Sequence, residues 1–193
     1  MIPRWSLVAA ALAVVLVGVA PHAQTLTPNV KKIGNAIREY QDSQIHAVIA
    51  YEYSNRYHDA GWLFIDTAVR TTDSLVFHRG DFTLVTPDEK TVMLAQQSQF
   101  IDDAPRITHI RQNARVWTRD LNPYFVDKHN NANFRLFALP GEGVVSDSIA
   151  TQKNGASFTT LYFQSPAAGW PSGTYQFVID NRKARAVIPI ELR

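Results

Sequence analysis

The sequence of 193 residues predicts a mainly β protein, an antiparallel β-sandwich with two added helices. Three observations support this prediction. Between residues 169 and 192, apolar side chains alternate with polar ones on both sides of a polar break, as in a hairpin with one face on a core. About eight or nine short segments of strand composition follow one another with turn residues between them. Two other segments repeat apolar residues every three or four positions, as helices do.

The N-terminus has the pattern of a secretory signal peptide at residues 1–23. Arg4 provides the positive start, residues 5–20 form an apolar run, and Ala23 suits the last removed position. The run is shorter than the about 20 apolar residues that span a membrane comfortably. We therefore expect an extracytoplasmic protein, periplasmic or secreted. An uncleaved N-terminal anchor is the alternative, and contact with a membrane is expected only if this segment is retained.

The mature chain would contain residues 24–193, with 18 basic and 17 acidic side chains once Arg4 is removed. This length suits one domain with a sizeable core. The chain has no cysteine, so we expect packing alone to hold that core. A nearly neutral charge balance argues against nucleic acid as a partner.

A first helix is expected at residues 28–41, within an N-terminal helical segment at 24–44. Thr27 suits the N-cap and Pro28 the first helical position. The apolar residues that would share one face are Val30, Ile33, Ile37 and Tyr40.

A second helix is expected at residues 105–120, inside a helical insertion at about 96–121. Pro105 lies near its start, behind two aspartates that suit the helix dipole, and Asn122-Pro123 ends it.

The β-sandwich domain is expected to span residues 45–193. Its strands before the C-terminal hairpin are expected at 45–54, 62–71, 74–78, 81–85, 91–94, 133–139, 144–150 and 158–164. The strand at 62–71 begins with apolar residues on both faces, Trp62 and Phe64 on one and Leu63 and Ile65 on the other. A strand of this kind is typical of a sheet centre, so we infer that a helix lies over its second face.

Three segments resemble strands of secreted bacterial immunoglobulin-like domains of the telokin-like kind. They are WLFIDTAVRTTDSLVFHRGDFTLVTPDEKTVML at 62–94, ASFTTLYFQSPAAGWPSGTYQFVID at 156–180, and the closing strand at 184–192. The resemblance implies an immunoglobulin-like sandwich that works as an extracytoplasmic interaction module, with no catalytic residues to carry over. The approach to Tyr175 through Pro171 is also similar to a tyrosine corner, in which the phenol bonds to nearby backbone.

Arg111, Arg115 and Arg119 are spaced by four and would stack on one face of the second helix. Like charges at this spacing repel unless an anion or carboxylates lie among them. One interpretation is a solvated helix face, with neighbouring aspartates as partners. The other is a docking stripe for an acidic partner or a phosphate group, which the planar guanidinium favours.

A second candidate group lies around the end of the first strand, and its members are Tyr51, Tyr53, Arg56, Tyr57 and His58. Tyrosines beside arginine are typical of recognition surfaces and sugar-stacking sites. They are equally common where a strand ends over an ordinary core.

Residue types used in hydrolysis occur at His58-Asp59, His78-Arg79-Asp81 and Ser146-Asp147-Ser148. Possible metal ligands lie close together at Asp127, His129, Asn130 and Asn131, but a calcium site needs more carboxylates at regular spacing. No nucleotide loop, zinc-protease helix or nucleophile elbow is present. We therefore expect neither a metal site nor a cofactor.

The favoured function is an exported, non-catalytic binding or structural module of the cell envelope, with a protein or envelope component as partner. One alternative is a periplasmic, hydrolase-like enzyme with a His/Asp site in its loops. Another is an envelope assembly subunit that adds strands to a partner through an exposed sheet edge.

Overall fold

The structure of the protein, a computed structural model, describes residues 29–57, 61–125, 130–167 and 169–193. It is mainly β, with several sheets whose strands pair antiparallel except for one short pair, as the sequence predicts. The signal peptide expected at 1–23 lies outside the described residues, as do Thr27 and Pro28.

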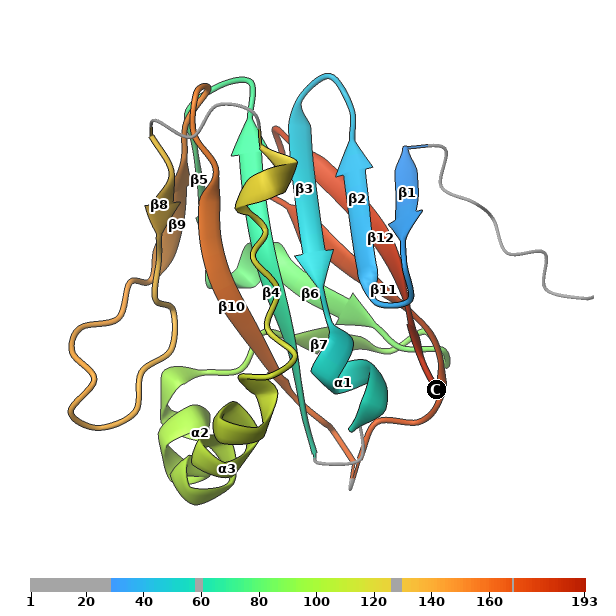
Figure 1. The fold of residues 1–193 in the computed structure, drawn as a ribbon, viewed down its shortest axis with the longest axis vertical. Helices are drawn as coiled ribbons and strands as arrows, with labels where there is room; N and C mark the ends of the chain where they lie inside the picture. The colour runs from blue at the N-terminus through green and yellow to red at the C-terminus, as the bar shows by residue number, and fades with distance from the viewer. Residues whose placement is uncertain (1–28, 58–60, 126–129, 168) are drawn as a thin grey trace, which may run out of the picture.

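The larger sheet has six strands in the order β1-β2-β3-β4-β10-β8. Their bounds are Val30–Ile33 (β1), Ile37–Gln41 (β2), Ile45–Ala50 (β3), Trp62–Thr71 (β4), Ser157–Gln164 (β10) and Ala132–Asn133 (β8). All neighbours pair antiparallel except β8 and β10, which are parallel. In Figure 1 this sheet faces the viewer.

A four-stranded sheet lies behind it, in the order β12-β11-β6-β7. Its strands are Arg185–Leu192 (β12), Gly173–Asp180 (β11), Phe82–Val85 (β6) and Thr91–Met93 (β7). A further pair, Leu75–His78 (β5) and Ser148–Thr151 (β9), forms a small sheet of its own.

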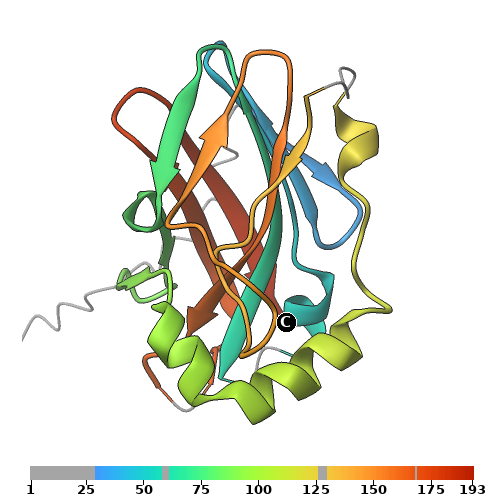
Figure 2. The same ribbon diagram turned by 90° about the vertical axis from the view of Figure 1, so that its left-hand side faces the viewer.

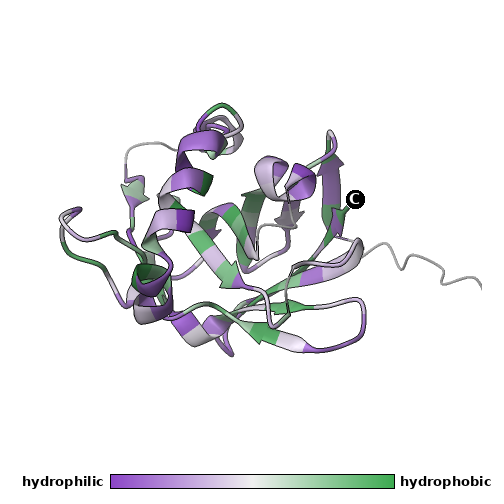
Figure 3. Cartoon of the chain, turned by 90° about the horizontal axis from the view of Figure 1, so that it is seen from below, coloured by the Kyte–Doolittle hydropathy of each residue, from purple (hydrophilic) through white to green (hydrophobic). Residues whose placement is uncertain are grey.

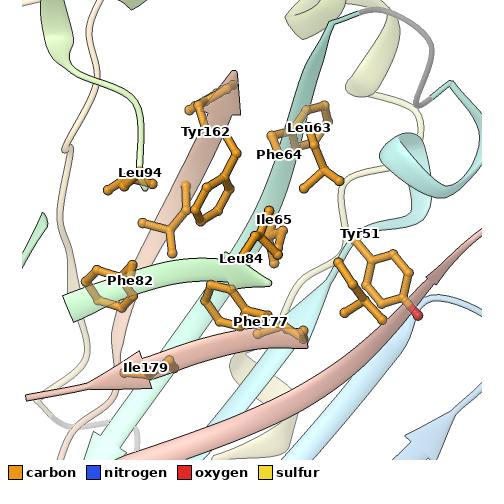
Figure 4. Packing of buried hydrophobic residues seen from close by; sticks show 14 of the residues in the cluster. Tyr51, Leu63, Phe64, Ile65, Phe82, Leu84, Leu94, Tyr162, Phe177 and Ile179 are labelled. Atoms are coloured by element: carbon orange, nitrogen blue, oxygen red, sulfur yellow. The ribbon is translucent and has the colours of Figure 1, made fainter. Parts of the chain in front are cut away.

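The main core fills the space between the two larger sheets (Figure 4). Leu63 and Ile65 of β4 and Phe177 and Ile179 of β11 are fully buried in it. The register of the C-terminal hairpin places Phe177 opposite Ile188, which is also fully buried. The alternation predicted for this hairpin is therefore confirmed.

The helices gather at one end of the molecule (Figures 1 and 2). They are α1 (Glu52–Arg56), α2 (Gln97–Asp102) and α3 (Ala104–Ala114). Two 3-10 turns lie at Arg79–Asp81 and Asn122–Tyr124. Seen from that end, the helices carry hydrophilic residues along much of their length (Figure 3). None of the helices in the described part of the chain is long and apolar enough to cross a membrane.

The helix predicted at 28–41 is wrong, because this segment is the β1–β2 hairpin. Its apolar residues do not line one helix face but pair across the hairpin, Val30 with Tyr40 and Ile33 with Ile37. The chain reverses at Gly34, whose φ of 65° lies in the left-handed region that glycine adopts most easily. Apolar residues spaced by three and four therefore also fit a hairpin centred on residue 35.

Two predicted strands end early, because backbone groups there form hydrogen bonds with side chains in place of a neighbouring strand. The strand expected at 45–54 stops at Ala50, and α1 follows. The Ser54 hydroxyl donates to the carbonyl of Phe64 and accepts from its N–H, both at 2.9 Å. Of the strand expected at 133–139 only β8 forms, and the carbonyls of Leu136 and Ala138 accept from side chains instead.

Other predicted bounds need smaller corrections. Helices α2 and α3 lie within the segment 96–121, and the helix expected at 105–120 ends at Ala114. The strand expected at 144–150 is shorter and begins at Ser148.

Candidate functional site

The outward face of the larger sheet carries the candidate site along its two adjacent strands β4 and β10. In their antiparallel register Phe64 lies opposite Tyr162, Asp66 opposite Thr160, and Ala68 opposite Phe158. Side chains at alternate positions of a strand share one face, so these three pairs form neighbouring rows on the same side of the sheet.

Helices α2 and α3 cover the Phe64–Tyr162 end of this face. Phe100 of α2 is buried, with its ring centroid 4.8 Å from that of Tyr162 and 6.2 Å from that of Trp62. The Trp62 indole N–H donates a 2.7 Å hydrogen bond to Asp103, just before α3. The helix that the sequence predicts over the second face of this strand is therefore confirmed.

The segment that follows α3 covers the opposite end of the same face. In Figure 1 it runs in front of β4 toward the 3-10 turn at Asn122–Tyr124. Leu121 and Phe125 are buried there in a second apolar cluster with Val48 and Ala68. The Phe125 ring also lies edge-on to Phe158, at a centroid distance of 5.8 Å.

The row of Asp66 and Thr160 lies between these two covers and forms the floor of a cleft. A hollow of about 300 Å³ lies against α3, and a second of about 290 Å³ lies toward the 3-10 turn. Asp66, Thr118 and Thr160 line both hollows. A third, of about 460 Å³, extends from Thr160 and Tyr162 toward the loop at 134–146. All three hollows share Thr160 as a lining residue, and we call them together the Asp66 cleft.

Asp66 is a charged group placed where desolvation is costly. The Thr160 hydroxyl donates a 2.7 Å hydrogen bond to its Oδ1. Burial raises the pKa of Asp66 from its ordinary 3.8 to about 6, although the bond from Thr160 acts in the opposite direction. Burial also raises the pKa of the Tyr162 phenol, so at neutral pH Tyr162 keeps its proton. The floor of the cleft thus combines a carboxyl group that titrates near neutrality with a neutral phenol.

One wall of the cleft is fixed by an ion pair between α3 and the loop after Leu139. The Arg111 Nη1 donates to both oxygens of Glu142, at 2.8 and 2.7 Å. The guanidinium lowers the pKa of the Glu142 carboxyl, and the Leu139 N–H donates to the same group at 2.8 Å. Both side chains are half-buried, so this pair is less screened than an exposed one.

The three arginines do not form the single stripe that the sequence predicts, because α3 ends at Ala114. Arg111 is paired with Glu142, and Arg119 donates to Glu52 of α1 at 2.9 Å. Neither partner is one of the aspartates proposed from the sequence. Arg115 is exposed and lines the hollow beside Asp66, and among the described residues it forms no ion pair. Arg115 therefore places a guanidinium without an ion pair at the rim of the cleft beside Asp66.

The tyrosine group splits between the core and the surface. Tyr51 and Tyr53 are buried, which corrects their assignment to a binding surface. Tyr57 is 45% exposed, and the Arg56 guanidinium lies 4.3 Å from the centre of the Trp117 ring. This contact and the Arg119–Glu52 pair hold the cleft wall at 115–119 against α1.

Two of the three groups considered for hydrolysis lie side by side, because His78 is the direct partner of Ser148 in the antiparallel register of β5 and β9. His58-Asp59, Asp127 and His129 lie outside the described residues. The Asp81 carboxylate accepts from the His78 backbone N–H at 2.8 Å and so closes a 3-10 turn. Among the described residues no group of three or more His, Asp or Glu side chains could hold a metal ion.

Asp66, Thr160, Tyr162 and Glu142 line the cleft but were not identified from the sequence. One signal was present for Asp66, since it is the charged residue that interrupts a strand apolar on both faces. Glu142 carried no such signal, because its partner Arg111 comes from a separate helix.

No family model, no curated protein and no solved structure gives a significant match to this chain.

Proposed function

We propose that the protein is an exported, non-catalytic binding module of the cell envelope, and that its ligand enters the Asp66 cleft. The observation that carries this proposal is the placement of Asp66 on a floor otherwise flanked by apolar rows. A carboxyl group with a raised pKa in a cleft costs stability at neutral pH, which is typical of a functional site.

The surroundings of Asp66 support binding of a polar ligand. Thr160 and Tyr162 provide hydroxyl groups, and Arg115 provides an unpaired cation at the rim. The ion pair of Arg111 with Glu142 holds the wall in place without a ligand. A few convergent polar groups among apolar surroundings are the usual composition of a ligand site.

The proposal is tested by recording backbone amide spectra of the ¹⁵N-labelled protein with fractions of envelope extract. We expect one fraction to shift the signals of Asp66, Thr160 and Arg115 and to leave those of the β11–β12 turn unmoved. Thr160→Val should weaken that response, because the variant loses the hydroxyl bonded to Asp66. Thr174→Val, on the exposed face of β11, is the matched control. Fractions that shift only signals outside the cleft would refute the proposal.

Acid–base catalysis in the same cleft is a second candidate, in place of a His/Asp site in the loops. Burial raises the pKa of Asp66, whereas Arg111 lowers the pKa of Glu142, and both carboxyl groups line one hollow. Two carboxyl groups driven apart in pKa are typical of an acid and a base. A product formed from the bound fraction, and lost in both Asp66→Asn and Glu142→Gln, would favour the enzyme over the binding module.

Assembly by strand addition is less well supported. Lys31 and Lys32 are exposed on the edge strand β1, an arrangement that discourages pairing with another chain.

We also propose that the domain is immunoglobulin-like in architecture. Two packed sheets whose strands pair antiparallel except for β8 and β10, and the hydrogen bond from the Tyr175 hydroxyl to the Pro171 carbonyl, support this assignment. The meander β1-β2-β3-β4 within one sheet is a departure from the usual strand order.

A further inference from the structure

The Asp66 cleft has two neighbouring parts of similar size but different chemistry. The hollow of about 300 Å³ has the cation Arg115 at its rim, while its other arginine, Arg111, is paired with Glu142. The hollow of about 290 Å³ has two partly exposed aromatic rings, Phe134 and Phe158. The two hollows meet at the floor of Asp66 and Thr160. A ligand that fills both must therefore join an anionic unit to a unit with an apolar face.

The aromatic part suits a sugar ring. A sugar presents C–H groups on one side of its ring, and these pack on the electron-rich face of an aromatic side chain. Its hydroxyl groups need donors and acceptors around the rim. Asn133 lines this hollow and provides an exposed amide group, while Asp66 provides an acceptor at the floor.

The cationic part suits a carboxylate. The Arg111 guanidinium is already occupied by Glu142, which leaves Arg115 as the unpaired cation of this hollow among the described residues. A guanidinium binds a planar carboxylate through two parallel hydrogen bonds. An ionised Asp66 would oppose such a ligand, whereas its protonated form would donate a hydrogen bond to it.

Resting on the function proposed above, we propose that the Asp66 cleft binds an acidic oligosaccharide. The carboxylate of one sugar lies at Arg115, and a neighbouring sugar ring packs against Phe134 and Phe158. Two neighbouring hollows that share Asp66, Thr118 and Thr160 favour a chain of linked sugars over a single small molecule.

The test compares three probes by calorimetry on the purified protein at low salt. They are tri-galacturonate, the neutral trisaccharide maltotriose, and inorganic phosphate. We expect tri-galacturonate to bind about tenfold more tightly than maltotriose, and its affinity to fall as salt is added. Phosphate alone should bind more weakly than tri-galacturonate, because it has no ring for the aromatic part.

Arg115→Gln should lower the affinity for tri-galacturonate about tenfold and leave that for maltotriose unchanged. The matched control is Arg182→Gln, which removes the same charge from the β11–β12 turn of the other sheet and should change neither affinity. Equal affinity for both trisaccharides, or equal binding of phosphate, would overturn the proposal. If an envelope fraction shifts the cleft signals while neither trisaccharide binds, the ligand class is wrong and the binding function stands.

Discussion

Thr160 on β10 donates a 2.7 Å hydrogen bond to Asp66, its direct partner on β4, at the centre of the outer face of the larger sheet. The rows on either side of this pair are covered, by α2 and α3 at one end and by the segment around Phe125 at the other. The cleft is the uncovered part of this face, where the polar pair of Asp66 and Thr160 lies between the two covered ends.

Replacement of Asp66 by asparagine should stabilise the protein at neutral pH. The pKa of Asp66 is about 6 when folded and 3.8 in the ordinary state, so the folded chain holds this proton more tightly. The contribution of Asp66 to wild-type stability therefore falls as pH rises from about 4 through about 6. We expect Asp66→Asn to gain up to about 3 kcal/mol of unfolding free energy at about pH 7.5 and almost nothing near pH 4.

Urea denaturation across this pH range measures the effect. Asp88→Asn is the matched control, because Lys90 lowers the pKa of this exposed carboxyl group and its loss should give no such gain. A gain for Asp66→Asn that does not change with pH would contradict the assignment of a raised pKa.

The pair of Arg111 and Glu142 should contribute measurable coupling. A double-mutant cycle with Arg111→Gln and Glu142→Gln is expected to give about 1 kcal/mol, because both side chains are half-buried. The exposed pair of Asp88 and Lys90, examined in the same way, should give no measurable coupling. Equal coupling in the two cycles would show that the cleft wall is not held by this ion pair.

The phenol of Tyr175 closes the loop before β11 by donating a 2.7 Å hydrogen bond to the Pro171 carbonyl. Tyr175→Phe should lower the unfolding free energy by about 1 kcal/mol. Tyr57→Phe, at an exposed tyrosine, should leave it unchanged. A melting curve for Tyr175→Phe that matches wild type would exclude a stabilising tyrosine corner.

Gly34 distinguishes the hairpin from the helix that the sequence suggests. Its φ of 65° disfavours any side chain, although an added Cβ would meet no atom within 4 Å. In the hairpin, Gly34→Ala should cost about 1 kcal/mol, whereas in a helix interior it would gain about as much. Gly80→Ala, at a glycine with equally open space and no positive φ, is the control. The sign of the change in melting temperature decides between the two structures.

The sequence predicts secondary structure well where the pattern of apolar residues fits only one kind of element. Strand β4 and the C-terminal hairpin were predicted closely, because alternation over eight or more residues admits no helix. The segment with Val30 and Tyr40 was predicted wrongly as a helix. Apolar spacings of three and four also arise from pairing across a short hairpin.

The candidate site was harder to predict because it depends on contacts far apart in the chain. Glu142 lies 31 residues from Arg111, and Thr160 lies 94 residues from Asp66. Of the residues proposed from the sequence, Arg111, Arg115 and Arg119 line the cleft, but Tyr51 belongs to the core. Spacing alone identified basic residues near the site and missed the carboxyl group at its centre.

The most direct test of the account is the titration of the Asp66 side-chain carboxyl, followed by its ¹³C chemical shift with and without the envelope fraction that shifts the cleft signals. We predict a pKa of about 6 in the free protein and a displaced pKa in the bound one. A carboxyl group that titrates near its ordinary 3.8, or that titrates identically in both samples, would contradict the placement of the binding site at Asp66.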